Sequence, residues 1–233
     1  MSAWAAKRFW SDVFVRVAEG GYEVLLDARV LKTPGKVSLV LPTQALAEAV
    51  AEEWSKVEGA LKPHLMPMTR LANTAIEKVA PLRDEVVAEV LRYGGSDLLC
   101  YRAEGPAKLI ARENEVWDPL LHWAAEVLGA ELTVTAGIIA VEQPQLAMER
   151  LREVVRGFDN FALTAIYEMT AISGSLVIAL AAAHDHDPEA LWSAARLQEH
   201  VQSEQWGVDE EAAELELLKK ADFLTALRFL KAV

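Results

Sequence analysis

Hydrophobic and polar residues alternate along the first part of the chain. Valines occupy every second position at the start of residues 13–18, a Gly-Gly pair follows, and a second extended run covers residues 22–27. This pattern is typical of two strands joined by a tight turn and predicts a β-hairpin. Shorter extended pieces at 30–32 and 37–41 are punctuated by proline, so the sheet is expected to be small and antiparallel.

The spacing of apolar residues then changes from two to three or four, which predicts helices that cover the sheet. Thr43 can cap a first helix that ends near Gly59. A second helix is expected from Thr69, and Pro81 suits the first turn of a third helix that ends at Tyr93.

Two places in the middle of the chain leave alternatives open. A helix is expected to begin at Pro106 and extend to Leu128, and Pro119 either kinks it or ends and restarts it. Residues 132–135 and 138–141 alternate weakly around a glycine, which predicts either a second hairpin or an extra sheet edge.

Beyond Gln143 the pattern is helical and predicts a bundle of about five helices. They are expected at residues 145–156, 160–172, 175–183, 188–205 and 209–230. The helix at 175–183 is apolar on all sides and should lie at the centre. The expected fold class is α+β, with a small antiparallel β-rich N-terminal domain and covering helices at 1–103, followed by an all-helical bundle at 104–233. The border is expected within 101–143.

Composition narrows the classes of partner. The chain has 233 residues with 23 basic and 35 acidic side chains, a formal net charge of −12. This charge repels phosphate backbones and anionic lipid headgroups, so we expect no nucleic acid partner. The most apolar run, residues 171–183, is too short to span a bilayer, so we expect no membrane insertion. It favours either solubility alone or an acidic docking face. The single cysteine, Cys100, excludes an intramolecular disulfide and is expected to be a small buried hydrophobe. We expect a cytoplasmic protein without a targeting segment, monomeric when free.

The common catalytic and phosphate-binding motifs are missing from the sequence. The run from His184 to Asp187 has the side chains of a metal site, but its position before a proline favours helix capping instead. Asp97, Cys100 and Arg102 form the densest group of reactive types. They leave an enzyme with a cleft site around these three residues as the alternative function, but a chain turn at Asp97 with Arg102 as its ion-pair partner is the favoured interpretation. We therefore expect no metal and no cofactor.

The C-terminal third contains one strongly polar stretch, residues 197–211, interrupted by a single large aromatic, Trp206. Such a surface can bind another chain without chemistry. Alternatively, Trp206 fills the bundle core and the acids after Gly207 begin the last helix, where the helix dipole favours negative charge. The dipole does not explain Glu204, which lies near the end of the preceding helix.

Several blocks along nearly the whole chain resemble, in order, the assembly chaperone family that serves the catalytic head of F-type ATP synthase. These blocks are Lys7-Arg8-Phe9-Trp10, Met66-Pro67-Met68-Thr69-Arg70-Leu71-Ala72-Asn73-Thr74-Ala75, Ser96-Asp97-Leu98-Leu99-Cys100-Tyr101-Arg102-Ala103, Trp117-Asp118-Pro119-Leu120-Leu121, Gly174-Ser175-Leu176 and Gln202-Ser203-Glu204-Gln205-Trp206-Gly207.

The resemblance implies a chaperone without enzymatic activity that binds the free α subunit of the synthase head, prevents its aggregation and hands it over to the β subunit. It also implies a functional glutamate in the Gln-x-Glu-x-Trp-Gly block, which maps onto Glu204. Gln198-Glu199-His200 stands ahead of this block, where the family suggests a more acidic start. The expected partner-binding residues are Gln202, Glu204, Gln205, Trp206, Asp209 and Glu210. A structural subunit that stays in a permanent complex is a further alternative.

Overall fold

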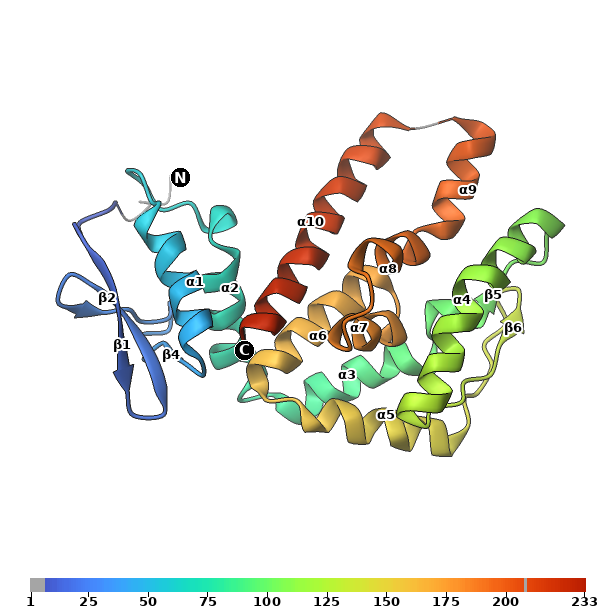
Figure 1. The fold of residues 1–233 in the computed structure, drawn as a ribbon, viewed down its shortest axis with the longest axis horizontal. Helices are drawn as coiled ribbons and strands as arrows, with labels where there is room; N and C mark the ends of the chain where they lie inside the picture. The colour runs from blue at the N-terminus through green and yellow to red at the C-terminus, as the bar shows by residue number, and fades with distance from the viewer. Residues whose placement is uncertain (1–6, 208) are drawn as a thin grey trace. The chain divides into compact units, whose positions relative to one another are not determined.

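The structure is a computed structural model that describes residues 7–207 and 209–233 (Figure 1). Two compact units are present. The first contains the chain up to Arg83 together with Asn160–Thr164 and Arg228–Val233, and the second contains Asp84–Asp159 and Ala165–Leu227. The border of separately folding domains, expected within 101–143, stays a prediction. The expected absence of a targeting segment depends on the N-terminus, and residues 1–6 lie outside the described residues, so it stays a prediction.

The first unit contains a four-stranded antiparallel sheet formed by β1 (Val13–Ala18), β2 (Gly21–Leu26), β3 (Arg29–Val30) and β4 (Val40–Leu41). Strand β2 pairs with β1 along its whole length and with both β3 and β4. The predicted hairpin is confirmed. Its turn requires Gly21, because a Cβ at this position would overlap the backbone carbonyl of Leu41.

The helices of the first unit are α1 (Gln44–Ser55), a 3₁₀ turn (Pro63–Leu65), α2 (Pro67–Thr74) and a π-helical segment (Ala75–Val79). Thr43 caps α1 as predicted, since its Oγ1 accepts a hydrogen bond from the Leu46 amide at 3.1 Å. The expected start of α2 at Thr69 was two residues late. Glu53 accepts hydrogen bonds from the amides of Met68 and Thr69 at 2.6 and 2.8 Å, so a side chain from α1 caps α2.

The following elements are α3 (Arg83–Gly95), a 3₁₀ turn (Leu98–Cys100), β5 (Tyr101–Arg102), α4 (Ala107–Leu128) and β6 (Thr135–Ala136). Helix α4 is continuous through Pro119. The alternative that the helix ends and restarts at this proline was therefore wrong. Trp117, Leu120 and Leu121 are buried on both sides of the proline, and their packing holds the two halves of α4 in place.

The prediction of a second hairpin at residues 132–141 was wrong. Strand β6 pairs in parallel with β5, with Tyr101 opposite Thr135 and Arg102 opposite Ala136. It is therefore the extra edge that the sequence left as the other possibility.

Six helices complete the described chain: α5 (Gln145–Gly157), α6 (Asn160–Ser173), α7 (Leu176–Ala183), α8 (Pro188–Ala195), α9 (Leu197–Trp206) and α10 (Glu210–Ala232). The single helix expected at 188–205 is divided at Arg196, whose backbone leaves helical geometry at φ −112° and ψ 13°. Its side chain donates to the Ile172 carbonyl at 2.9 Å, so a contact distant in sequence accompanies the break.

Helix α7 lies in the core of the second unit. Its residues from Leu176 to Ala182 are all buried, which confirms the position predicted from its uniformly apolar sequence. Ser175 caps the helix, because its Oγ accepts a hydrogen bond from the Ile178 amide at 3.0 Å. The α+β class, with a small antiparallel sheet first and helices afterwards, is confirmed.

Candidate partner-binding site

The polar stretch singled out in the sequence forms α9 and the start of α10 (Figure 1). Trp206 is the last residue of α9, and 85% of its surface is exposed. The alternative that Trp206 fills the bundle core is therefore wrong. A large, exposed aromatic side chain at a helix end is an available anchor for another protein.

Glu204 lies in the last turn of α9 and has a partner that the sequence did not show. Arg112 of α4 donates from Nη1 to Glu204 Oε1 at 2.8 Å. The hydrogen bond from Arg112 is the largest cause that lowers the pKa of Glu204, so the carboxylate is charged at neutral pH. The ion pair also offsets the unfavourable interaction of an acid with the helix C-terminus. About half of the Glu204 side chain remains exposed, at 49%.

The structure brings some of the expected site residues together in a groove of about 540 Å³ between α9 and α10. Gln202, Trp206 and Asp209 line this groove, whereas Glu204, Gln205 and Glu210 do not. All six are exposed. Asp209 also has a structural role, since its Oδ1 accepts hydrogen bonds from the amides of Glu211 and Ala212 at 3.0 and 3.2 Å, as a helix N-cap does.

The first half of α10 adds apolar surface that the sequence reasoning missed. Leu215, which lines the groove, is 52% exposed, and Leu217 and Leu218 are 68% and 64% exposed. The sequence does contain a pattern that indicates this exposure. Successive helical residues are turned by about 100°, so Leu215 and Leu217 lie about 200° apart and cannot both face one core.

Residues 197–218 carry a negative charge, although Arg196 and Lys219, which flank this stretch, also line the groove. This stretch has no lysine or arginine and seven carboxylates, from Glu199, Glu204, Asp209, Glu210, Glu211, Glu214 and Glu216. Exposed leucines and a tryptophan among carboxylates suit a partner with apolar side chains flanked by basic groups.

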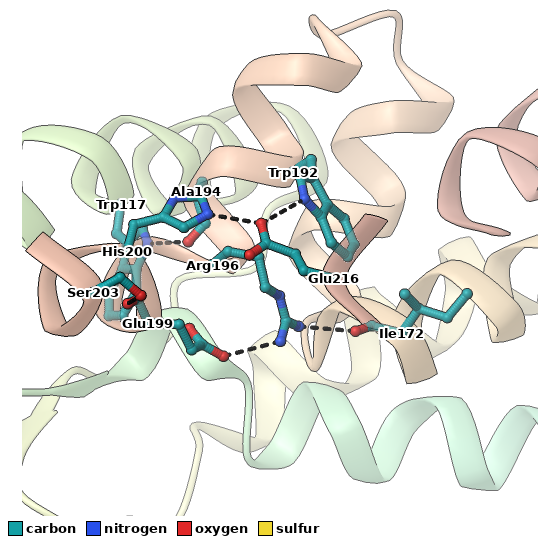
Figure 2. Close-up of polar contacts among 9 residues, drawn as sticks. All are labelled: Trp117, Ile172, Trp192, Ala194, Arg196, Glu199, His200, Ser203 and Glu216. Atoms are coloured by element: carbon teal, nitrogen blue, oxygen red, sulfur yellow. Dashed lines mark hydrogen bonds and ion pairs between the residues drawn. The ribbon is translucent and has the colours of Figure 1, made fainter. Parts of the chain in front are cut away.

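A polar network fixes the base of this groove (Figure 2). His200 of α9 and Glu216 of α10 are in contact, with Nε2 and Oε1 2.7 Å apart, and the same carboxylate oxygen accepts from Trp192 Nε1 of α8 at 3.3 Å. Arg196 Nη1 donates to Glu199 Oε1 at 2.9 Å. These contacts connect three consecutive helices, α8, α9 and α10, and give His200 a structural role.

The cluster proposed for an enzyme is buried. Asp97 accepts hydrogen bonds from the amides of Leu99 and Val177, both at 3.1 Å, and so holds two backbone segments. Burial, together with the nearby Asp97 charge, raises the pKa of Cys100 to about 12, whereas a nucleophilic cysteine needs a lowered value. Arg102 donates to Asp118 Oδ1 at 2.7 Å, so its ion-pair partner is Asp118 and the expected pairing with Asp97 was wrong. The cluster has the geometry of a structural turn, and Cys100 is the buried hydrophobe that the sequence predicted.

The His184–Asp187 run caps and packs helices. The Nδ1 atoms of His184 and His186 contact the carbonyls of Leu180 and Ala181 at 2.9 and 3.1 Å. Asp187 caps α8. Within the described parts of the chain, no group of three or more His, Cys, Asp or Glu side chains has the arrangement of a metal site. Among these same residues, no helix has the length and apolar character needed to span a membrane.

An exposed, partly apolar groove beside a run of carboxylates is a feature typical of proteins that bind other proteins, a class that includes chaperones. Comparison with known proteins makes this specific. The family model described as ATP12 chaperone protein matches residues 7–125. The chain belongs to the ATP12 chaperone family, and its resemblance to the assembly chaperones of ATP synthase is confirmed.

Relatives of known structure cover nearly the whole chain. Atp12 from Paracoccus denitrificans is 45% identical, with a TM-score of 0.94, over 97% of this chain and 98% of that one. A point mutant of P. denitrificans Atp12p is also 45% identical, with a TM-score of 0.96, over 99% of each chain. The mitochondrial protein atp12 of Schizosaccharomyces pombe is 26% identical over 223 residues, which are 90% of this chain and 77% of that protein.

Proposed function

We propose that this chaperone binds the free α subunit of the ATP synthase head, keeps it soluble and releases it when the β subunit arrives. We further propose that the client contacts the end of α9 and the start of α10, through Gln202, Glu204, Gln205, Trp206, Asp209 and Glu210. The observation that carries this second proposal is the exposure of Trp206, 85%, in a groove flanked by the carboxylates of α9 and α10.

The energetics favour Trp206 as an anchor. A tryptophan buries about 150–250 Å² on docking, which corresponds to roughly 5 kcal/mol of gross hydrophobic stabilisation at about 25 cal/mol per Å². Association costs consume part of this gain. Truncating such an anchor typically costs about 2 kcal/mol or more, so Trp206→Ala should weaken client binding by about 30-fold.

Two variants with matched controls test the site. Trp206→Ala is compared with Ile138→Ala, since Ile138 is another exposed apolar residue, at 96%. Glu204→Lys is compared with Glu153→Lys, because Glu153 is also an exposed glutamate paired with one arginine, Arg150. Each variant is mixed with purified α subunit, and aggregation is followed by light scattering. Urea unfolding of each variant measures its stability.

We expect the two site variants to lose holding of the α subunit while their stability is unchanged, and both controls to behave like the wild type. Equal holding by all four variants would remove α9 from the client site. Loss of holding together with stability would show that the residues act through the fold.

The ion pair between Arg112 and Glu204 needs a separate test, because Glu204→Lys also breaks it. The double variant Arg112→Glu/Glu204→Lys restores the pair with its charges exchanged. If Glu204 contacts the client, the double variant still fails to hold the α subunit. Restored holding would mean that Glu204 serves only to position α9.

The identity of the client is tested independently of the site. Immobilised wild-type protein is incubated with purified α or purified β subunit, and retained protein is measured. We expect retention of α and its release when β is added. Retention of β alone would overturn the proposed client, and α that stays bound in the presence of β would support a permanent subunit. Light scattering during gel filtration checks the expected monomer.

A further inference from the structure

A second concave surface is present in the first unit. It is a pocket of about 440 Å³, a volume within the usual range of about 300–1,000 Å³ for ligand sites. None of the residues proposed for the client site line it. The lining side chains come from the loop after β3, from α1, and from the segment that continues through α2, namely Lys32, Thr33, Pro34, Trp54, Leu61, Pro63, Met66, Thr69, Arg70, Asn73, Thr74, Glu77 and Lys78.

One wall of this pocket is apolar and held in place. The half-buried indole of Trp54 donates from Nε1 to Thr69 Oγ1 at 3.1 Å, and the Trp10 ring packs against it at 5.2 Å between ring centroids. Pro63 and Met66 extend the apolar lining. A wall fixed in this way loses little conformational freedom when a ligand binds, which favours affinity.

The rim of the pocket is basic. Lys32, Arg70 and Lys78 line it with exposed side chains, against one acidic residue, Glu77. The Glu77 carboxylate already accepts a hydrogen bond from the Gly35 amide. This basic rim occurs on a chain whose net charge is −12. A local positive potential on an acidic protein favours anionic ligands, among which the carboxylates of Asp and Glu are the ones that a peptide supplies.

Two further features mark this pocket as more than a surface irregularity. Within the described residues, the Oδ1 atom of Asn73 is buried and has no hydrogen-bond partner. Rotation of its side-chain amide would present hydrogen-bonding atoms to a ligand backbone. In addition, α2 continues into a π-helical segment, Ala75–Val79, which supplies Glu77 and Lys78. Such segments are rare and frequently occur at functional sites.

We infer that this pocket binds an extended peptide segment in which a large apolar side chain stands next to Asp or Glu. The apolar side chain occupies the wall formed by Trp54, the neighbouring carboxylates meet the basic rim, and the peptide backbone bonds to Asn73. The charge of its preferred ligand is opposite to that of a ligand suited to the carboxylates of residues 199–216. The chaperone therefore has a second, chemically distinct peptide site, whatever client the groove binds.

Three fluorescein-labelled hexapeptides test the inference on the full chain by fluorescence anisotropy. The first, Gly-Asp-Leu-Phe-Asp-Gly, has the proposed chemistry. In Gly-Lys-Leu-Phe-Lys-Gly the charges are reversed, and in Gly-Asp-Ser-Gly-Asp-Gly the apolar side chains are missing. We expect only the first to bind, with an affinity that falls as salt is added. Failure of the first to bind at about millimolar concentration, or equal binding of the three, would overturn the proposal.

Variants locate the binding. Lys32→Glu/Lys78→Glu reverses the rim and should weaken the first peptide by about tenfold or more, which is about 1.4 kcal/mol. The control Lys7→Glu/Lys36→Glu makes the same change in charge at exposed lysines outside the pocket and should change the affinity by less than about twofold.

Filling the pocket gives an independent result. Thr74→Trp places a ring among the lining residues and should abolish binding without altering the rim charges. Circular dichroism confirms the fold of each variant. Unchanged affinity in a folded Thr74→Trp variant would place the peptide elsewhere and overturn the site. These outcomes are separate from the α-subunit experiments, because no residue of α9 or α10 is altered.

Discussion

The buried carboxyl of Asp97 should make the stability of the protein depend on pH in a direction opposite to that of most acidic groups. Asp97 is fully buried, and this burial raises its pKa from 3.8 to about 6. Hydrogen bonds from Ser175 and from the amides of Val177 and Leu99 act in the opposite direction but do not outweigh burial.

The direction and the size of this pH dependence follow from the difference in proton binding between the folded and unfolded chains. The folded chain binds the Asp97 proton more tightly than the unfolded chain, so the stabilising contribution of this carboxyl is complete below about pH 4. It is lost as the pH rises to about 6. A difference of about two pKa units, at about 1.36 kcal/mol each, makes this loss about 3 kcal/mol in the free energy of unfolding.

The variant Asp97→Asn isolates the effect, because asparagine does not titrate in this range. Urea unfolding of both proteins is followed by far-UV circular dichroism between about pH 4 and about pH 8. The free energy of unfolding of the wild type minus that of the variant should fall by about 3 kcal/mol across this range. Asp187→Asn, which removes an exposed capping carboxylate, controls for the loss of one acidic group.

A wild-type-minus-variant difference that is constant with pH would refute the raised pKa of Asp97. A difference that grows with pH would mean that the helix N-terminus and the hydrogen bonds outweigh burial. Both results are measured as differences, so the titration of other groups cancels.

Three shorter predictions concern the second unit. Iodoacetamide should modify Cys100 in folded protein at least about 1,000-fold more slowly than in urea-unfolded protein, because the thiol is buried and its pKa is raised to about 12; rapid reaction of folded protein would revive the enzyme alternative. Ser175→Ala should lower the free energy of unfolding by about 1–2 kcal/mol, since the amide of Ile178 loses its cap, and an unchanged urea midpoint would contradict this role. Trp117→Phe should lower it by about 1–3 kcal/mol, because the buried carbonyl of Ala194 loses its indole donor at 2.9 Å, and undiminished stability would show that another donor replaces it.

Much of the fold could be predicted because local patterns determine local backbone. The hairpin follows from alternating residues around a Gly-Gly turn, and the central position of α7 follows from an apolar sequence on every side. The predicted helix bounds were wrong where a contact with a residue distant in sequence determines where a helix begins or ends. Glu53 moves the start of α2, and Arg196 separates α8 from α9 while its side chain bonds to Ile172.

The candidate site was only partly visible in the sequence. Trp206 and Glu204 were singled out by their polar surroundings and by the resemblance to the chaperone family. The Arg112 partner of Glu204 was not, because 92 positions separate the two residues. The exposed leucines of α10 could have been found from their angular spacing around the helix.

By itself, the sequence determined the kinds of element, their approximate bounds, the acidic charge and the family. Periodicity and turn residues determine the backbone of nearby residues, and composition determines the net charge, so none of these depends on tertiary contacts. Only the tertiary structure decided which surfaces stay uncovered, since burial depends on contacts between residues far apart in sequence. Trp206 at 85% exposure is the clearest case, because the same tryptophan in the same helix could equally have filled a core.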